Sequence, residues 1–535
     1  MEAEKAGARR WWALGALAIS MLVVGIDLFV LSLALPTLSV DLHASTSDLQ
    51  WFVDAYSLAL AAALLPAGLL GDRWGRRKML AGALALFGVA SLACAYAGSS
   101  GELIAARTVL GLAAAVIMPM ALAVLPVLFT PAERPKAIGI VGGATFVGFP
   151  IGPILGGWLL DHFWWGSVFL INAPVVVLAV IAVLFLMPES RSSQRPRIDF
   201  GGVLISSAGL ITLVYGVITA GQKGWSDTTA IATMAAGAVV LAGFGLWERM
   251  MTRRPGAQPL VDLSLFRSAG FAAGTTLSTM VQFALFGITF AMPQFFLDVW
   301  GLDSLASGVR LLPLVGGLAV GLGIGQRLQT PRAAAGDKPA RGPLVSVKAL
   351  TTAGFVIMGA ALAGGTATGP DSSTGFVATW FAVTGLGLGL AMPTAMNAAL
   401  GALTPERSGS GSALMTTMRQ VGATVGVAVL GTVLNSVYQA RLHLGGVPHA
   451  AAAAARDSVA GGLVAAHATG SASLLTEVRD AYSGGLDIML WVCAGIAVLA
   501  ALVAVAFLPR QADPDPAGPG PAAALPNVTA AAQAE

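Results

Sequence analysis

The chain has 535 residues, of which 56% are hydrophobic and only 11% are charged. Soluble domains carry roughly a quarter charged residues, so this composition excludes an ordinary soluble protein. The net charge of +3 gives no support for nucleic-acid binding. Both cysteines, Cys94 and Cys493, lie inside long apolar runs, which excludes a disulfide framework and a CxxC metal pair.

Fourteen apolar runs follow one another along the chain, each of the length that crosses a bilayer, about 20 residues. The first run begins beside the N-terminus, but it is too long for a signal-peptide core and no A-x-A cleavage site follows it. The sequence therefore predicts an all-α integral membrane protein with 14 transmembrane helices. The predicted spans are Trp12–Leu38, Leu49–Leu70, Met79–Gly98, Leu103–Phe129, Ala137–Leu160, Ser167–Met187, Phe200–Ala220, Thr229–Trp247, Phe271–Leu297, Leu305–Gly325, Leu344–Leu362, Gly375–Leu400, Ser410–Val437 and Ile488–Leu508.

Most of the 30 lysines and arginines fall in alternate loops on one side of these spans. Because positively charged loops stay in the cytoplasm, both termini are predicted to be cytoplasmic. The loop of residues 439–485 then lies outside and is expected to form a short helical hairpin. The tail of residues 511–535 is rich in Pro and Ala and is predicted to be disordered in the cytoplasm. An arginine-rich, lysine-poor composition suggests a GC-rich bacterium, and hence its plasma membrane.

Two acids lie clearly inside predicted spans, Asp27 near the middle of the first and Asp54 near the outer mouth of the second. A charge in a bilayer costs at least ~2.5–3.5 kcal/mol, so such acids are functional candidates. All five histidines fall outside the apolar runs, so a carried proton needs a carboxylate. A carboxylate that binds either a proton or a cation is the minimal element of an antiporter. The alternative is structural: each acid pairs with Arg107 of the fourth span or with a hydroxyl. Arg107 could itself be an interface arginine.

Two further segments carry patterns beyond simple membrane spans. In GLLGDRWGRRKML, which begins at Gly68, the glycines Gly68 and Gly75 permit a tight turn, and Asp72 can interact with the positive end of a facing helix. Arg73 and Arg76 can bind lipid headgroups or Asp72, although a positive cytoplasmic loop alone explains such charges.

In GFPIGPILGG of the fifth span, Gly148, Gly152 and Gly156 recur every four residues and form one smooth helical face. Pro153 bends the backbone, and Gly157 extends the small-residue run. Close packing without any further function is the alternative for this segment.

These segments together resemble the major facilitator superfamily, and within it the fourteen-helix drug:proton antiporter branch. GLLGDRWGRRKML resembles the family's loop signature, GFPIGPILGG its antiporter motif, and LIAARTVLGLAAA its fourth-helix motif around a basic residue. WFVDAYSLALA and FWWGSVFLINAP are most similar to pumps for quaternary ammonium compounds and other drug cations. The resemblance covers residues 10–510. It implies that Asp27 and Asp54 handle protons and cations, that Arg107 takes part in proton coupling, and that Asp72 belongs to a latch between two halves.

The resemblance also implies a fold and an activity. Residues 12–187 and 271–508 would form two six-helix bundles, and residues 200–248 an inserted helix pair. The expected function is proton-coupled export of lipophilic cations by alternating access, driven by the proton gradient, without a cofactor or nucleic acid and as a monomer. Some relatives have further acids deep in the second half, whereas Asp298 and Asp487 lie only near predicted helix ends.

Three alternatives stay open. The same fold could export an antibiotic made by the producing cell, neutral or anionic. A membrane enzyme is disfavoured, because the sequence has no HExxH, GxSxG or nucleotide-binding loop. A sensor that has kept the fold without transporting is the third, and the intact motifs argue against it.

Overall fold

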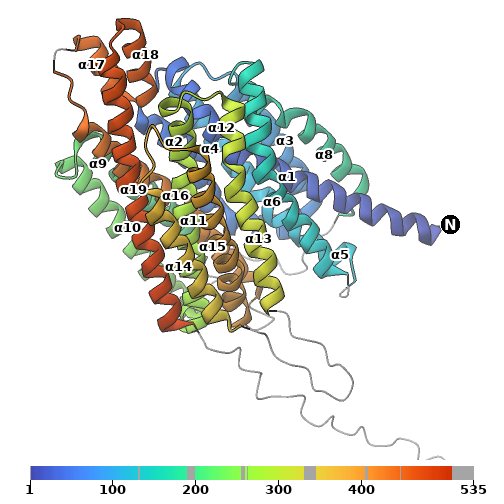
Figure 1. Cartoon of the computed structure of the whole chain (residues 1–535). Coiled ribbons are helices and arrows are strands. Elements are labelled where there is room, and N and C mark those ends of the chain that lie inside the picture. The colour runs from blue at the N-terminus through green and yellow to red at the C-terminus, as the bar shows by residue number, and fades with distance from the viewer. Residues whose placement is uncertain are drawn as a thin grey trace, which may run out of the picture.

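The structure is a computed structural model that describes residues 2–130, 133–189, 199–254, 260–261, 263–329, 345–403, 408–445 and 447–508. Within these ranges every regular element is a helix and no strand occurs. In lipid every backbone polar group needs a partner inside its own segment, which is why apolar runs of this length fold as helices. The prediction of an all-α protein is confirmed (Figure 1).

Eight helices come from the first part of the chain. They are α1 (Glu2–Asp41), α2 (Thr46–Trp74), α3 (Arg76–Ala95), α4 (Ser100–Ala123), α5 (Leu125–Leu128), α6 (Arg134–His162), α7 (Ser167–Leu170) and α8 (Asn172–Leu186). Two further helices, α9 (Phe200–Lys223) and α10 (Thr228–Arg253), form a pair.

The remaining elements come from the second part of the chain. They are η1 (Leu263–Arg267), α11 (Ala269–Gln294), the π-helix η2 (Phe295–Val299), α12 (Ser304–Arg310), α13 (Leu312–Gln329), α14 (Val347–Gly365), α15 (Thr374–Gly401), α16 (Ser408–Arg441), α17 (His449–Asp457), α18 (Val459–Thr469) and α19 (Ala472–Phe507).

Many of these helices begin where a short polar side chain accepts a hydrogen bond from a free backbone N–H of the first turn. The capping residues are Ser99, Asp199, Asp227, Ser268, Asp303, Ser346, Ser373, Ser458 and Ser471. Each stands directly before its helix, so the chain leaves a loop and enters the next helix at a position that the local sequence determines.

Twelve helices of the described chain are long and apolar enough to cross a membrane. Helices α2 and α6, which are not among those twelve, cover the second and fifth predicted spans. Each predicted span therefore coincides with one helix or with two consecutive ones. Helix α19 begins at Ala472, well before the predicted span at Ile488, so part of the predicted external loop is helical.

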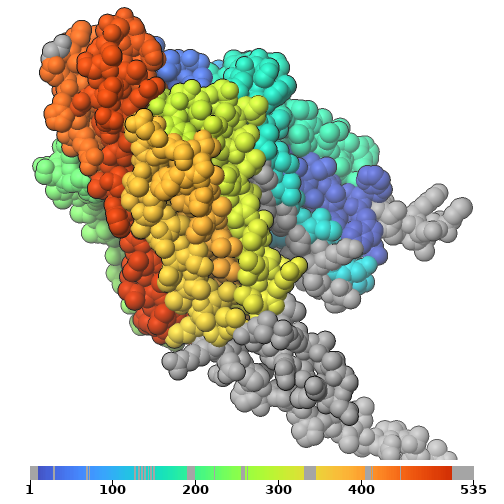
Figure 2. All heavy atoms as spheres, viewed as in Figure 1, coloured from blue at the N-terminus to red at the C-terminus, as the bar shows by residue number. Residues whose placement is uncertain are grey.

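The helices pack in two groups. In the first, α1 packs on α6 and α8, α2 packs on α4, and α3 packs on α4 and α8. In the second, α11 packs on α15 and α16, α15 packs on α13 and α14, and α19 packs on α14 and α16. The groups meet where α2 contacts α16 and where α6 contacts α12. Figure 2 shows the second group, in yellow to red, beside the blue and cyan helices of the first.

Helix α9 lies against both sides of this junction, because it packs on α2 and on α16. Its hydrogen bonds go to α16 alone among the described contacts between these helices. Thr432 donates to the carbonyl oxygen of Val217 at 3.1 Å, and Asn435 donates to that of Gly221 at 3.1 Å. The inserted pair is therefore attached to the second group and only packed against the first.

Helices α17 and α18 project from one end of the molecule, which we call the hairpin end (Figures 1 and 2). They dock onto the first group there. The hydroxyl oxygens of Ser39 and Ser458 are 2.8 Å apart, and Thr46 donates to the carbonyl oxygen of Asp457 at 3.1 Å. The hairpin thus bridges the two groups.

A second bridge at the hairpin end joins α6 to α12. The carboxylate of Asp161 accepts hydrogen bonds from the backbone N–H groups of Ser304 and Leu305, both at 2.9 Å. A Cβ atom at Gly157 would stand 2.5 Å from the carbonyl oxygen of Ser304, so only glycine permits this approach. The two groups are held together at this end by backbone contact as well as by charge.

Candidate functional site

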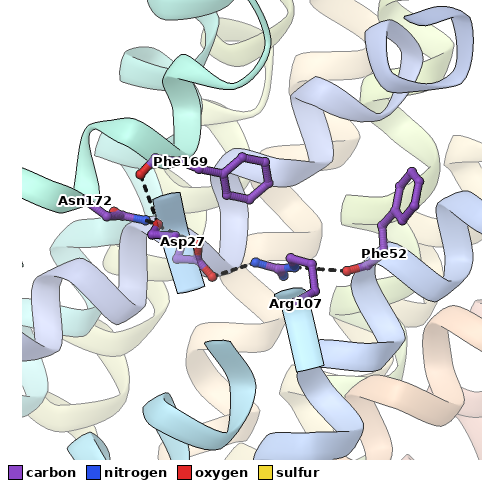
Figure 3. Close-up of polar contacts among 6 residues, drawn as sticks. Asp27, Phe52, Arg107, Phe169 and Asn172 are labelled. Carbon is purple, nitrogen blue, oxygen red and sulfur yellow. Dashed lines mark hydrogen bonds and ion pairs between the residues drawn. The ribbon is translucent and has the colours of Figure 1, made fainter. Parts of the chain in front are cut away.

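A buried ion pair joins α1 to α4 (Figure 3). The Nη1 of Arg107 donates to Oδ2 of Asp27 at 2.8 Å, and the two side chains are 2% and 0% exposed. The Nε of Arg107 donates to the carbonyl oxygen of Phe52 in α2 at 3.0 Å. The structure therefore pairs Asp27 with Arg107, as the structural alternative predicted. Arg107 is buried in this pair, so it is not an interface arginine.

The other carboxylate oxygen of Asp27 leads into a polar chain that connects α1 with α8, α3 and α7 (Figure 3). The amide nitrogen of Asn172 lies 3.4 Å from Oδ1 of Asp27 and donates to the hydroxyl of Ser91 at 3.0 Å. Ser91 in turn donates to the carbonyl oxygen of Phe169 at 3.0 Å. Asn172 and Ser91 are not among the residues predicted for the site. The signal for Asn172 in the sequence is an asparagine within the apolar run LINAP.

An aromatic ring covers the guanidinium of Arg107. Its central carbon lies 4.5 Å from the ring centroid of Tyr56, a distance at which the ring face attracts a cation. The hydroxyl of Tyr56 is buried and has no hydrogen-bond partner among the described residues. The ring of Phe169 lies farther away, at 6.0 Å, so Arg107 is neutralised by one carboxylate and stabilised by two rings.

Asp54 stands apart from this pair. It is fully buried, and neither carboxylate oxygen has a hydrogen-bond partner in the described part of the chain. One turn before it, Gln50 donates to the carbonyl oxygen of Ala428 in α16 at 3.3 Å. One turn after it, Leu58 packs in a cluster with Ala428. Side chains four residues apart share a helix face, so Asp54 lies on the face of α2 that meets α16.

The two acids therefore differ in their electrostatics. The charge of Asp27 is balanced by Arg107, whereas the charge of Asp54 has no partner among the described residues. Burying a lone carboxylate costs several kcal/mol. Asp54 is accordingly stable when it carries a proton or when a cation lies beside it. It lies at the junction of the two helix groups.

The glycines of α6 position α1, which carries Asp27. A Cβ atom at Gly148 would lie 2.6–2.9 Å from the backbone of Gly25 and Ile26, and one at Gly156 would lie 2.5 Å from a methyl carbon of Val30. These contacts bracket Asp27 along α1. Gly152 and Pro153 are buried in the same helix, and Gly157 faces α12 instead.

Substituting Gly148 with alanine is expected to push α6 away from α1 and to lower the thermal stability of the purified protein. The new methyl group would overlap backbone, which cannot move aside as a flexible side chain can. Overpacking of this kind typically costs about 1–3 kcal/mol. Gly15→Ala in α1 is the matched control, because nothing lies within 4 Å of its Cβ position. Equal melting temperatures for the two variants would contradict the close contact.

The segment GLLGDRWGRRKML forms the end of α2 and the turn into α3. Gly75 has φ of +106°, a conformation that favours glycine. Arg76 donates to the carbonyl oxygen of Ala123 at the end of α4 at 2.9 Å. The backbone N–H of Arg77 donates to Glu189 at 3.3 Å. These contacts stay within the first group.

The same segment contains three further predicted residues, Gly68, Asp72 and Arg73. Arg73 is exposed. Gly68 and Asp72 lie within α2, but their side-chain environment is outside the described part of the structure. The latch assigned to Asp72 therefore stays a prediction.

A family model described as Major Facilitator Superfamily matches residues 17–427. The chain belongs to the major facilitator superfamily. Transporters of this superfamily that it resembles include the tetracenomycin C resistance and export protein of Streptomyces glaucescens, which is 34% identical over 96% of this chain and 94% of that protein. The multidrug efflux pump LfrA of Mycolicibacterium smegmatis is 32% identical over 93% and 96%. The methyl viologen resistance protein SmvA of Salmonella typhimurium is 31% identical over 82% and 85%.

Solved structures of major facilitator transporters share the fold. A bacterial homologue of the human lysosomal transporter Spinster, in an inward-facing and unoccupied conformation, matches with a TM-score of 0.65 at 16% identity, over 93% of this chain and 96% of that one. A D-xylose–proton symporter matches with a TM-score of 0.57 at 13% identity, over 94% and 98%. The predicted fold is confirmed, and the chain is a multi-pass membrane transporter rather than an enzyme.

Proposed function

We propose that this transporter is a proton-coupled efflux antiporter for lipophilic cations such as quaternary ammonium compounds. The observation that carries the proposal is Asp54, a buried carboxylate at the junction of α2 and α16 for which the described part of the chain supplies no partner. A proton and a cation can each neutralise it, and they compete. The relatives support this reading, since one is named for multidrug efflux and another for resistance to methyl viologen, itself a quaternary dication.

In the proposed arrangement the chain crosses the bacterial plasma membrane fourteen times. Residues 12–187 and 271–508 form the two bundles, and residues 200–248 the inserted pair. The hairpin end, with loop 439–485, faces outside, and both termini are cytoplasmic. The tail of residues 511–535 lies outside the described residues. The contacts of Asp161 and Ser39 at the hairpin end support a conformation that is closed to the outside.

The proposed cycle begins with a cation that enters from the cytoplasm or the inner leaflet. It displaces the proton of Asp54, and the contacts at the hairpin end then release. An external proton returns to Asp54 as the cation leaves. The exchange at Asp54 is coupled to the pair of Asp27 and Arg107 through α2, because Arg107 is hydrogen-bonded to the carbonyl oxygen of Phe52 in that helix. The segment of Gly68, Asp72, Arg73, Gly75 and Arg76 latches the bundles on the cytoplasmic side.

The proton gradient supplies the energy, so the proposed pump uses no cofactor. We also propose that it acts as a monomer. Uptake of ethidium into proteoliposomes with an imposed pH gradient tests the proton coupling. Wild-type protein whose hairpin end faces the lumen is expected to move ethidium into the lumen against its concentration gradient, and an ionophore that collapses the pH gradient should stop this uptake. Uphill movement that survives the collapse would overturn proton coupling.

A second candidate is export of an antibiotic made by the producing cell. It is favoured by the similarity to the tetracenomycin C exporter and to the puromycin resistance protein of Streptomyces alboniger. Such a substrate can be neutral or anionic, in which case Asp54 does not bind it. Transport of a neutral antibiotic at equal rates by wild type and Asp54→Asn would favour this candidate over cation export.

A further inference from the structure

A further buried acid, Asp298, lies at the hairpin end of the second group. Asp298 belongs to the π-helix η2, which continues α11 and packs against α18 and α19. It is 8% exposed and makes no hydrogen bond or ion pair with any described residue. A π-helix inserts an extra residue into the turn and changes the direction of its side chains, and such turns are frequent at functional sites.

Aromatic rings surround this stretch of chain. The indole of Trp300 lies 5.5 Å and 5.4 Å, centroid to centroid, from the rings of Phe295 and Phe296. Tyr482 of α19 stacks on Phe295 at 6.5 Å, and Tyr438 of α16 contacts Tyr482 at 6.5 Å. Both tyrosines lie within electrostatic range of the Asp298 carboxylate. Rings from η2 and the residue after it, from α19 and from α16 therefore form one connected cluster at the position of this acid.

The polar groups of these aromatic residues are engaged elsewhere. The hydroxyl of Tyr438 donates to the carbonyl oxygen of Ala455 at 2.7 Å, and that of Tyr482 donates to the carbonyl oxygen of Ala291 at 2.8 Å. They are not available to neutralise Asp298.

A neighbouring basic side chain does not neutralise it either. The guanidinium of Arg479 reaches to 3.8 Å from the Cβ position of Gly301, yet no ion pair within 4.0 Å joins it to Asp298. Asp298 therefore has no counter-charge among the described residues, and Tyr438 and Tyr482 are its nearby aromatic neighbours.

A carboxylate among aromatic faces matches the chemistry of an organic cation. The rings attract a diffuse positive charge while the acid balances it, and both effects are stronger away from water. A metal ion would need several oxygen, nitrogen or sulfur ligands, and the described residues hold no group of three such side chains. In this conformation the rings touch one another, so a cation enters only when the hairpin end opens.

We propose that Asp298, with the rings of Phe295, Phe296, Trp300, Tyr438 and Tyr482, forms a second binding site for lipophilic organic cations, separate from Asp54 and used on the outward path. This inference rests on the cation export proposed above. The cation would then move in two steps, from the junction of the bundles to the hairpin end. Asp54 balances its charge at the first position and Asp298 at the second.

Equilibrium binding to the purified full chain in lipid nanodiscs tests the site. The probe is radiolabelled methyltriphenylphosphonium, and triphenylphosphine oxide serves as its neutral analogue of similar shape. Wild type is expected to bind two equivalents of the cation, and Asp298→Asn and Asp54→Asn one each. Asp298→Asn should leave binding of the neutral analogue unchanged. Asp480→Asn, which removes an exposed acid at the same end, is the control and should behave as wild type.

A second variant tests the same site if Asp298→Asn fails to fold. Trp300→Leu removes one ring but no charge, and is expected to weaken the outer cation site about thirtyfold, because a desolvated cation–ring contact is of that strength. Trp300→Phe should recover most of the affinity. Two equivalents bound by Asp298→Asn would overturn the second site while leaving cation export intact. No cation binding by wild type would overturn both proposals.

Discussion

Replacing Asp54 with asparagine is expected to reduce proton-driven cation export to the level of protein-free liposomes. The amide can neither release a proton nor balance a cation, so no group remains at this position that can exchange a proton for a cation. The variant should fold at least as well as wild type, because it removes a buried carboxylate that has no partner. Ethidium flux under an imposed pH gradient and the melting temperature of the purified protein measure the two effects.

The matched control for this prediction is Asp41→Asn, which removes an exposed acid at the end of α1. It should pump as wild type does. Uphill export by Asp54→Asn at the wild-type rate would exclude Asp54 as the exchange site and direct attention to Asp27.

Asp27→Asn should damage the fold as well as the transport. It leaves the guanidinium of Arg107 buried without a counter-charge, and removal of one partner of a buried pair costs about 3–5 kcal/mol. Arginine cannot release its proton in a protein, so the imbalance has no relief. Arg107→Gln leaves an acid instead, and a proton can neutralise that acid. We therefore expect a lower melting temperature for Asp27→Asn than for Arg107→Gln.

The double variant Asp27→Asn, Arg107→Gln separates stability from function. Both charges are absent, so its melting temperature should return toward wild type. Transport should stay impaired, because the link between Asp27 in α1 and Phe52 in α2 is lost. Melting temperatures that add up as if the two sites were independent would show that the ion pair does not couple them.

Hydropathy predicted the helices well because each apolar run must form one. It could not predict where helices extend beyond the apolar run or break within it. Helix α1 starts at Glu2 and α19 at Ala472, since polar residues can continue a helix outside the apolar region. The break at Val124 between α4 and α5 stands just before Pro126, which has no backbone N–H to continue the helix, and the π-turn of η2 likewise has no signal in hydropathy.

The site was predictable only as a set of candidates. An acid in an apolar run is visible in the sequence, and both Asp27 and Asp54 were found in this way. Their different surroundings depend on which helix face each one occupies and on which helix meets that face. Asp298 shows the same limit: the sequence placed it near a helix end, where water is expected, and the folded chain buries it under α18 and α19.

The attachment of α9 to α16 gives the inserted pair a mechanical role. In the proposed cycle, α9 and α10 would move together with α16 relative to α2. The packing of α9 on α2, rather than its hydrogen bonds to α16, is then the contact that changes during transport. Substitutions in that packed surface would change the rate of the cycle without altering any residue of the binding sites.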